Sequence, residues 1–190
     1  MPPKPFYKKG SNFPLSRGKW DAMEGGLRVP FIISGPNIKA GSESKTPITF
    51  SDLLPTIIHI AGYKLPLNEK LDGGSFYKIL TKDRQGKVKR FSEGLIFNVP
   101  YENRIALRRA HSAIVLDEYK LIKFHNNGKL KLFHIKNDLG ENHNLVFSLP
   151  EKASELEFLL DSYLSKVKAP KWQPGITWKN KPIEKFNSYH

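Results

Sequence analysis

Lys19 is the charged residue whose surroundings most favour a chemical role. It follows Gly18 in a segment rich in Gly, Pro, Ser and Lys, and Glu24-Gly25-Gly26 comes a few residues later. Paired glycines permit tight turns and a close approach of the backbone to another group. A loop that leads into a strand is also a common place to present a charged side chain to a site. Because most lysines only solvate a surface, these arguments leave both a functional and a solvating role open for Lys19.

A second group of polar residues, farther along the chain, is rich in hydrogen-bond donors. It comprises Tyr101-Glu102-Asn103-Arg104 and Arg108-Arg109-Ala110-His111, which are predicted to be loop-like. Tyr101, Arg104 and His111 are candidates for contacts with a substrate. The alternative is that these side chains cap strands and face solvent.

The composition excludes some kinds of chemistry and leaves others open. The chain has no cysteine, so disulfides, cysteine-ligated zinc and a cysteine nucleophile are excluded. Thirty-one Lys and Arg against 18 Asp and Glu give a formal net charge of +13. Such a charge attracts polyanions such as nucleic acid, anionic lipid or a sulfated polysaccharide, although a solvated lysine-rich surface explains it equally well. No apolar run approaches the roughly 18 residues of a membrane span, and the first residues lack the apolar core of a signal peptide.

The elements that would position Lys19 are predicted in the first half of the chain. Val29 to Ile33 form a short apolar run that ends at Ser34-Gly35-Pro36, which predicts a strand buried on both faces. A helix is predicted over residues 52–61, capped by Ser51 or Thr49 and ended by Gly62. Its face of Leu and Ile side chains is apolar.

The second half of the chain is predicted to form a small α+β unit. Short strands are expected at residues 94–99, 111–116, 118–124 and 130–135. A hairpin turn is expected at Asn126-Asn127-Gly128. An amphipathic helix is expected from Pro150 until Pro170 closes it. A helix laid on an antiparallel sheet provides sufficient core for such a unit.

Several blocks of sequence, in order, resemble the C-terminal portion of the sulfatases, the arylsulfatase-like family of the alkaline phosphatase superfamily. In that family a Gly-Lys pair precedes an aromatic-Glu-Gly-Gly-x-Arg-x-Pro run, and this chain is similar at Gly18-Lys19 and at Glu24 to Pro30. Met23 departs from the pattern, because it stands where the family usually has Trp or Tyr. The other matching blocks are residues 52–62, 71–76, 111–122, 132–138 and 140–145.

The resemblance implies a division of the chain into three parts. Residues 1–90 would be an α/β remnant, the incomplete C-terminal end of the large mixed-sheet catalytic domain of a sulfatase. Residues 91–168 would be the small α+β subdomain, an antiparallel sheet of about four strands packed with a C-terminal helix. Residues 169–190 would be an irregular basic and aromatic tail.

The resemblance also implies roles for the candidate residues. Lys19 would hold an oxygen of the substrate's sulfate group, and no residue of this chain is expected to bind a metal. Tyr101, Arg104 and His111 would border the substrate pocket. The structural residues of the loop would be Gly18, Glu24, Gly25, Gly26 and Arg28, with Arg28 bracing the loop against a carboxylate.

Sulfatases also need parts that this sequence does not supply. Their nucleophile is a formylglycine made from a Cys/Ser-x-Pro/Ala-x-Arg motif, and calcium is bound by Asp and Asn or Gln. Neither motif precedes Lys19 here. We therefore expect this chain alone to be inactive and poorly soluble, and its partners to be a missing N-terminal sulfatase domain and a sulfated small-molecule or carbohydrate substrate.

The sequence also permits two other interpretations. No nucleic-acid motif is present and no nucleic-acid partner is expected, yet a non-enzymatic polyanion-binding module is an alternative, motivated by interleaved Lys and Trp residues in the tail. A phosphoester hydrolase of the same architecture is another. The resemblance is compatible with a periplasmic or secreted full-length protein, whose location the sequence does not determine.

Overall fold

The computed structural model describes residues 12–19, 21–63, 71–83, 85–102 and 109–171. Contacts divide the chain into two units: a sheet unit formed by Met1–Val29 with Gly94–His190, and an insert unit formed by Pro30–Glu93. None of the helices in the described part of the chain has the length and apolarity needed to span a bilayer.

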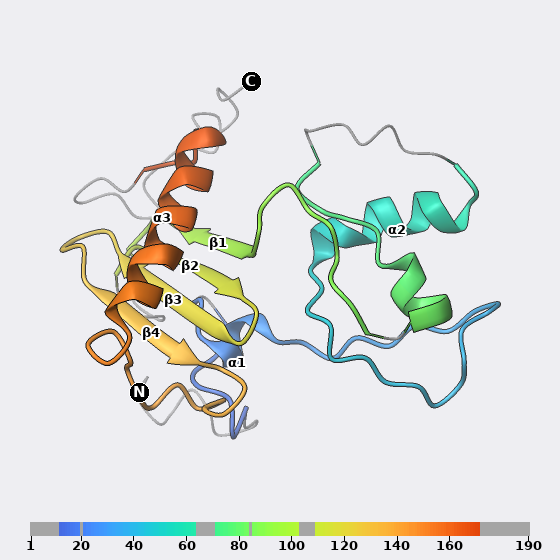
Figure 1. The fold of residues 1–190 in the computed structure, drawn as a ribbon, viewed down its shortest axis with the longest axis horizontal. Helices are drawn as coiled ribbons and strands as arrows, with labels where there is room; N and C mark the ends of the chain where they lie inside the picture. The colour runs from blue at the N-terminus through green and yellow to red at the C-terminus, as the bar shows by residue number, and fades with distance from the viewer. Residues whose placement is uncertain (1–11, 20, 64–70, 84, 103–108, 172–190) are drawn as a thin grey trace. The chain divides into compact units, whose positions relative to one another are not determined.

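The sheet unit is built on a four-stranded antiparallel sheet in the order β1-β2-β3-β4 (Figure 1). Its strands are β1 (Leu95–Val99), β2 (His111–Leu116), β3 (Tyr119–Phe124) and β4 (Leu130–His134). Neighbouring strands are joined in sequence order, so every pairing is local. Asp117 and Gly128 have φ of 52° and 66° in the turns after β2 and β3, a conformation that Asp and Gly tolerate better than most residues. The predicted small α+β unit is confirmed.

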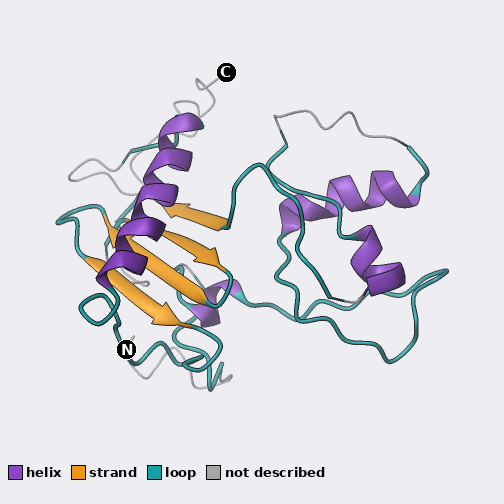
Figure 2. Cartoon of the chain, in the orientation of Figure 1, coloured by secondary structure: helices purple, strands orange, loops and turns teal. Residues whose placement is uncertain are grey.

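Helix α3 (Pro150–Lys166) lies across one face of this sheet (Figure 2). Its first turn accommodates Pro150, because the first helical N–H groups have no partner within the helix. The apolar side chains that α3 shares with the sheet form one core cluster: Ile114, Leu121, Leu132, Ala153, Leu156 and Leu160. This helix was predicted from its apolar periodicity.

The opposite face of the sheet is covered by the segment that contains α1 (Glu24–Leu27). Ala22 and Met23 belong to a second core cluster with Ala113, Val115, Ile122, Phe124, Phe133 and Ile135, and Leu27 packs against it. By its contacts within this chain, the segment around Lys19 therefore belongs to the sheet unit. The predicted division of the full-length protein at residue 90 stays a prediction.

The insert unit contains η2 (Phe50–Asp52), α2 (Leu53–Ile60) and the π-helical turn η3 (Ile79–Asp83). Thr49 and Asp52 form a capping box at the start of η2, which selects Thr49 of the two predicted caps, and Gly62 follows α2 with a φ of +79°. The core of this unit is small and consists of Phe76, Ile79 and Val88 with three partly buried neighbours.

The predicted strand at residues 29–33 is wrong for this chain. The structure assigns no strand there, and Ile32 is 93% exposed. A buried strand needs hydrogen-bonded neighbours on a sheet, and no described strand of the chain pairs with this run. The apolar sequence is present, but its partner strand is not among the described residues.

Candidate functional site

The loop that carries Lys19 closes on itself through backbone contacts. Gly25 N–H donates to the Ser16 carbonyl at 2.8 Å, and the Lys19 side chain is exposed on this loop. A Cβ on Gly25 would lie 2.4 Å from the Arg17 carbonyl oxygen, and a Cβ on Gly26 would lie 2.3 Å from that of Asp21. The two glycines are thus the residues that allow the backbone to close this loop.

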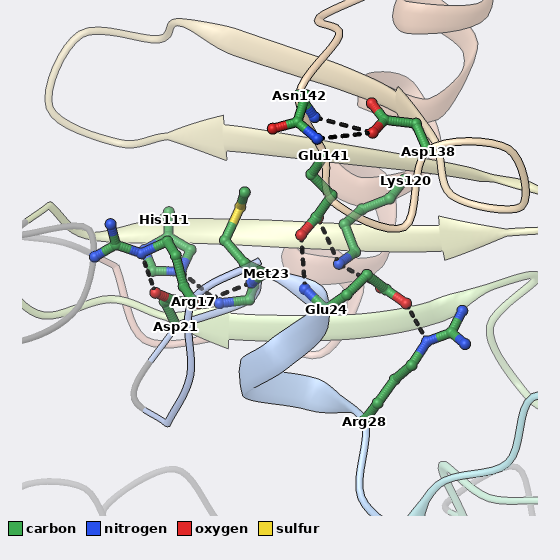
Figure 3. Close-up of polar contacts among 11 residues, drawn as sticks. Arg17, Asp21, Met23, Glu24, Arg28, His111, Lys120, Asp138, Glu141 and Asn142 are labelled. Atoms are coloured by element: carbon green, nitrogen blue, oxygen red, sulfur yellow. Dashed lines mark hydrogen bonds and ion pairs between the residues drawn. The ribbon is translucent and has the colours of Figure 1, made fainter. Parts of the chain in front are cut away.

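Asp21 holds the loop internally, and the residue after it joins the loop to a histidine of the sheet. Its Oδ2 accepts from Arg17 Nε at 2.6 Å, and its Oδ1 accepts from Met23 N–H at 3.0 Å. The next residue, Ala22, donates its N–H to His111 Nε2 at 3.1 Å (Figure 3). The start of β2 therefore holds the loop backbone directly.

His111 is completely buried and uses both ring nitrogens. Because Nε2 accepts from Ala22, the proton lies on Nδ1, which donates to the Arg109 carbonyl at 2.8 Å. Burial lowers the pKa of His111 below its usual range, and the Arg109 carbonyl opposes this only in part. His111 is therefore a neutral hydrogen-bonded ring inside the sheet unit.

Glu24, at the start of α1, is held by a buried group of charges (Figure 3). Lys120 Nζ from β3 lies 2.5 Å from Glu24 Oε1 and 2.9 Å from Glu141 Oε1. Glu141 Oε2 accepts from the Glu24 N–H at 2.8 Å, and Arg28 Nε donates to Glu24 Oε2. Burial raises the pKa of Glu141 above its usual range, against the opposing pull of Lys120.

The loop that presents Glu141 is itself ordered by a carboxylate. Asp138 accepts hydrogen bonds from the backbone N–H groups of Asn142 at 3.1 Å and His143 at 2.8 Å. These bonds hold the pKa of Asp138 below its usual range, although desolvation acts in the opposite direction and is the largest single contribution. Glu141 has a φ of +54°, which is uncommon for a residue other than glycine.

The structure places the predicted site residues unequally. Lys19 is exposed, Gly18 is buried and Tyr101 is half-buried, whereas Arg104 lies outside the described residues. The alternative in which His111 faces solvent does not hold, because its side chain lies inside the sheet unit. Both its nitrogens are engaged in this conformation, so a substrate contact by His111 stays a prediction.

Sequence reasoning missed Lys120 and Glu141. A signal for Lys120 was present, because alternation in β3 places it on the same face as Ile122 and Phe124. A lysine on an apolar face is rarely fully buried unless it is paired. Nothing local pointed to Glu141, whose partner Glu24 lies 117 positions earlier.

A metal site is not formed by the residues that the structure describes. Among the described residues, no group of three or more His, Asp or Glu side chains is placed to hold a metal ion. The carboxylates and the histidine described above are instead hydrogen-bonded or ion-paired to other groups of the protein. The sequence also has no Cys/Ser-x-Pro/Ala-x-Arg motif from which a formylglycine is made.

Comparison with known proteins gives a consistent result. A family model described as N-sulphoglucosamine sulphohydrolase, C-terminal, matches residues 19–169. A "Sulfatase" of Formosa agariphila is 29% identical over 190 residues, which cover 92% of this chain and 33% of that protein. The "Ulvan-active sulfatase" of the same species is 31% identical over 179 residues, which cover 80% of this chain and 35% of that protein.

A solved structure agrees with these sequence relatives. The crystal structure of Ps i-CgsB in complex with k-i-k-neocarrahexaose matches with a TM-score of 0.66 and 25% identity, covering 96% of this chain and 37% of the other. The chain thus spans about a third of the length of the relatives it matches.

Proposed function

The chain belongs to the sulfatase family, in the C-terminal domain described as that of N-sulphoglucosamine sulphohydrolase, and we propose that it is the C-terminal part of an enzyme that hydrolyses the sulfate esters of a carbohydrate. The carbohydrate substrate is supported by the ulvan-active relative and by the oligosaccharide bound to the structural relative. A net charge of +13 suits an anionic substrate.

Lys19 is the residue of this chain that would bind the sulfate group. The observation that carries this role is an exposed lysine on a loop whose backbone is fixed by buried contacts. A lysine is a compact charged donor, and preorganised charge stabilises a transition state best when it needs no rearrangement. Lys19 would hold a sulfate oxygen and neutralise negative charge there, while Tyr101 and Arg104 would contact the rest of the substrate.

The family implies calcium and formylglycine, but the described residues hold no group suited to a metal ion and the sequence has no Cys/Ser-x-Pro/Ala-x-Arg motif. We assign both to an upstream part of the full-length protein, where they would supply the electrophilic and nucleophilic chemistry. The chain alone is accordingly proposed to be inactive.

The apolar surface of the insert unit supports an upstream partner within the same enzyme. Its exposed large apolar side chains include Phe31, Ile32, Phe50, Leu54, Ile57, Ile60 and Tyr63. Leu54, Ile57 and Ile60 recur three positions apart on α2, which gives this helix an exposed apolar face. An apolar face of this kind is a surface that another part of a protein can cover. We propose that the upstream two thirds of the sulfatase cover this surface.

The test begins with the DNA upstream of Met1. It is expected to encode a Cys/Ser-x-Pro/Ala-x-Arg motif, and the joined polypeptide is expected to release sulfate from a sulfated oligosaccharide, whereas this chain alone releases none. In the joined enzyme Lys19→Ala should lower kcat/KM about a hundredfold, as loss of one charge-stabilising donor does elsewhere.

The matched control is Lys129→Ala, which removes an exposed lysine from the turn between β3 and β4. Equal rates for the two variants would overturn the role of Lys19. Upstream DNA without the motif, or sulfate release by this chain alone, would overturn the proposed division of labour between the two parts.

A further inference from the structure

We propose that Lys120 is a positioning residue, which fixes the Lys19 loop to the sheet by holding Glu24 and Glu141 together. The proposal rests on the sulfate-binding role given to Lys19 above. It concerns a buried group of charges that the proposed chemistry does not itself use.

Lys120 is buried in a way that only a specific partner arrangement makes stable. Its side chain is 0% exposed, and the side chains of Glu24 and Glu141 are 4% and 0% exposed. An isolated buried ammonium is very costly, so such groups are paired and hydrogen-bonded. Here one ammonium lies between two carboxylates that are 117 positions apart in the chain.

The same two carboxylates also hold backbone and surface groups. Glu141 accepts the N–H of Glu24 in addition to Lys120, so the first turn of α1 is bound at both side chain and backbone. Arg28 neutralises the other oxygen of Glu24 from the solvent side, since its own side chain is half exposed. The group therefore contains two cations and two anions with complementary contacts.

Fixing Glu24 also fixes Lys19, because little chain separates them. Lys19 lies five positions before Glu24, and the backbone of residues 16–18 closes on Gly25 and Gly26. Ala22 is held to His111 between these two points. The described residues on either side of Lys19, residues 16–18 and 21–24, are therefore held by these contacts.

A buried ion pair adds little to folding stability compared with apolar side chains of similar size. The buried charges around Lys120 therefore favour a positioning role. Well-packed apolar side chains often replace a buried ion pair without loss of stability. A charged group between two specific carboxylates, by contrast, accepts only one register of the loop against β3. We infer that the buried charges select the position of the loop.

The first experiment measures amide hydrogen exchange in the whole chain, wild type and Lys120→Met. Methionine keeps the length of the side chain and removes its charge. We expect exchange of the amides of residues 21–28 to rise about tenfold or more, while α3 and the β2–β3 ladder keep their protection, because local opening is independent of global unfolding.

Lys123→Met is the matched control. Lys123 lies on the same strand and also pairs with two carboxylates, Glu157 and Asp161 of α3, but on the other side of the sheet. It should leave exchange in residues 21–28 unchanged. Equal exchange in these residues for the Lys120 variant and the wild type would overturn the proposal.

Glu24→Gln covers the case in which Lys120→Met unfolds the whole sheet unit. This variant changes the loop side of the contact and leaves the sheet intact. Increased exchange confined to residues 21–28 would support the proposal. Unchanged exchange there would overturn it.

A second readout separates this proposal from the role of Lys19. In the joined enzyme, Lys120→Met should lower the same kinetic parameter as Lys19→Ala, and the double variant should be no slower than Lys19→Ala alone. A merely stabilising lysine would instead add its effect independently. If Lys19→Ala is silent while the exchange result holds, the proposed function fails and the positioning survives. If Lys19→Ala is slow and Lys120→Met is silent in both assays, the positioning fails alone.

Discussion

The sheet unit and the insert unit differ in how they use apolar residues. In the sheet unit both faces of the sheet are covered, by α3 on one side and by the segment of α1 on the other. The insert unit has a small core and several exposed large apolar side chains, three of them on α2. The comparison shows that a unit can bury its apolar residues only where its own helices and loops cover them.

The buried polar groups of the two units follow the same contrast. The sheet unit distributes its buried charges over Asp21, Glu24, Lys120 and Glu141, together with the neutral ring of His111. Among its described residues, the insert unit has one buried carboxylate, that of Asp52. In the insert unit one buried carboxylate therefore makes the kind of contacts that several buried ionised groups make in the sheet unit.

The largest effect that tests this contrast is expected for Asp52→Ala. Asp52 is fully buried and accepts from Thr49 N–H, Gly74 N–H and the Arg90 guanidinium at 2.6–2.9 Å. Its loss leaves Arg90 without its buried partner and should destabilise the insert unit by about 3–5 kcal/mol. Hydrogen exchange should rise in residues 49–60 and 73–77.

The control is Glu43→Ala, which removes an exposed acid from the same unit and should leave exchange unchanged. The comparison requires that Asp52→Ala spares the protection of the sheet. Loss of protection in β2 and α3 to the same degree would show that the two units unfold together.

The sequence predicted the sheet unit well for a physical reason. Each of its strands pairs with the next in the chain, so hairpin signals such as Asn126-Asn127-Gly128 and alternation within β3 contained most of the information. The strand predicted at residues 29–33 failed because its apolar pattern depends on neighbours outside the described residues. An apolar pattern indicates which side chains a segment can bury. Whether they are buried depends on the presence of a neighbouring strand or helix.

The candidate site was predictable in part. Gly25 and Gly26 signalled a close backbone approach, and the structure contains one. The ion group behind the loop was not predictable, because it joins Glu24 to Lys120 and Glu141 across most of the chain. His111 was predicted to lie in a loop-like polar segment, but its side chain is buried. Polar neighbours in the sequence do not reveal that a distant segment, residues 21–23, covers this side chain.

A smaller effect, on pH dependence, is expected from His111 and belongs to the sheet unit alone. Its pKa in the folded state is below the usual 6.5, so the unfolded state binds the proton more readily. The contribution of His111 to the free energy of unfolding is therefore full above pH 6.5 and is lost as the pH falls through 6.5 towards the folded pKa. Chemical denaturation between pH 7.5 and 5 should show this loss.

His111→Gln is expected to flatten this part of the pH profile, because the amide oxygen can still accept from Ala22 but does not titrate. Glu141 acts in the opposite sense, since its raised pKa means that its contribution is lost as the pH rises, and it is present in both proteins. His143→Gln, which removes an exposed histidine, is the control. A slope unchanged in His111→Gln would contradict the buried neutral ring.

The smallest effect on stability is expected for Ile57→Lys. This variant also tests most directly whether the exposed apolar residues of the insert unit differ from those of the sheet unit. Ile57 is 59% exposed on α2, and the matched residue in the sheet unit is Phe158, 70% exposed on α3. Either change to lysine should alter the free energy of unfolding by no more than about 0.5 kcal/mol, as exposed substitutions generally do. The soluble concentration of the isolated chain, measured after centrifugation, should rise more for Ile57→Lys, because Ile57 lies on α2 together with the exposed side chains of Leu54 and Ile60.

The same pair of variants also distinguishes an uncovered surface from one that is normally covered. If the insert unit packs against an upstream part of the enzyme, Ile57→Lys should weaken that association and lower the yield of active joined enzyme, whereas Phe158→Lys should change neither. Equal behaviour of the two variants in both assays would mean that the apolar surface of α2 is ordinary exposed surface. In that case the difference between the units would lie in core size alone, and the insert unit would have to be stable without any partner.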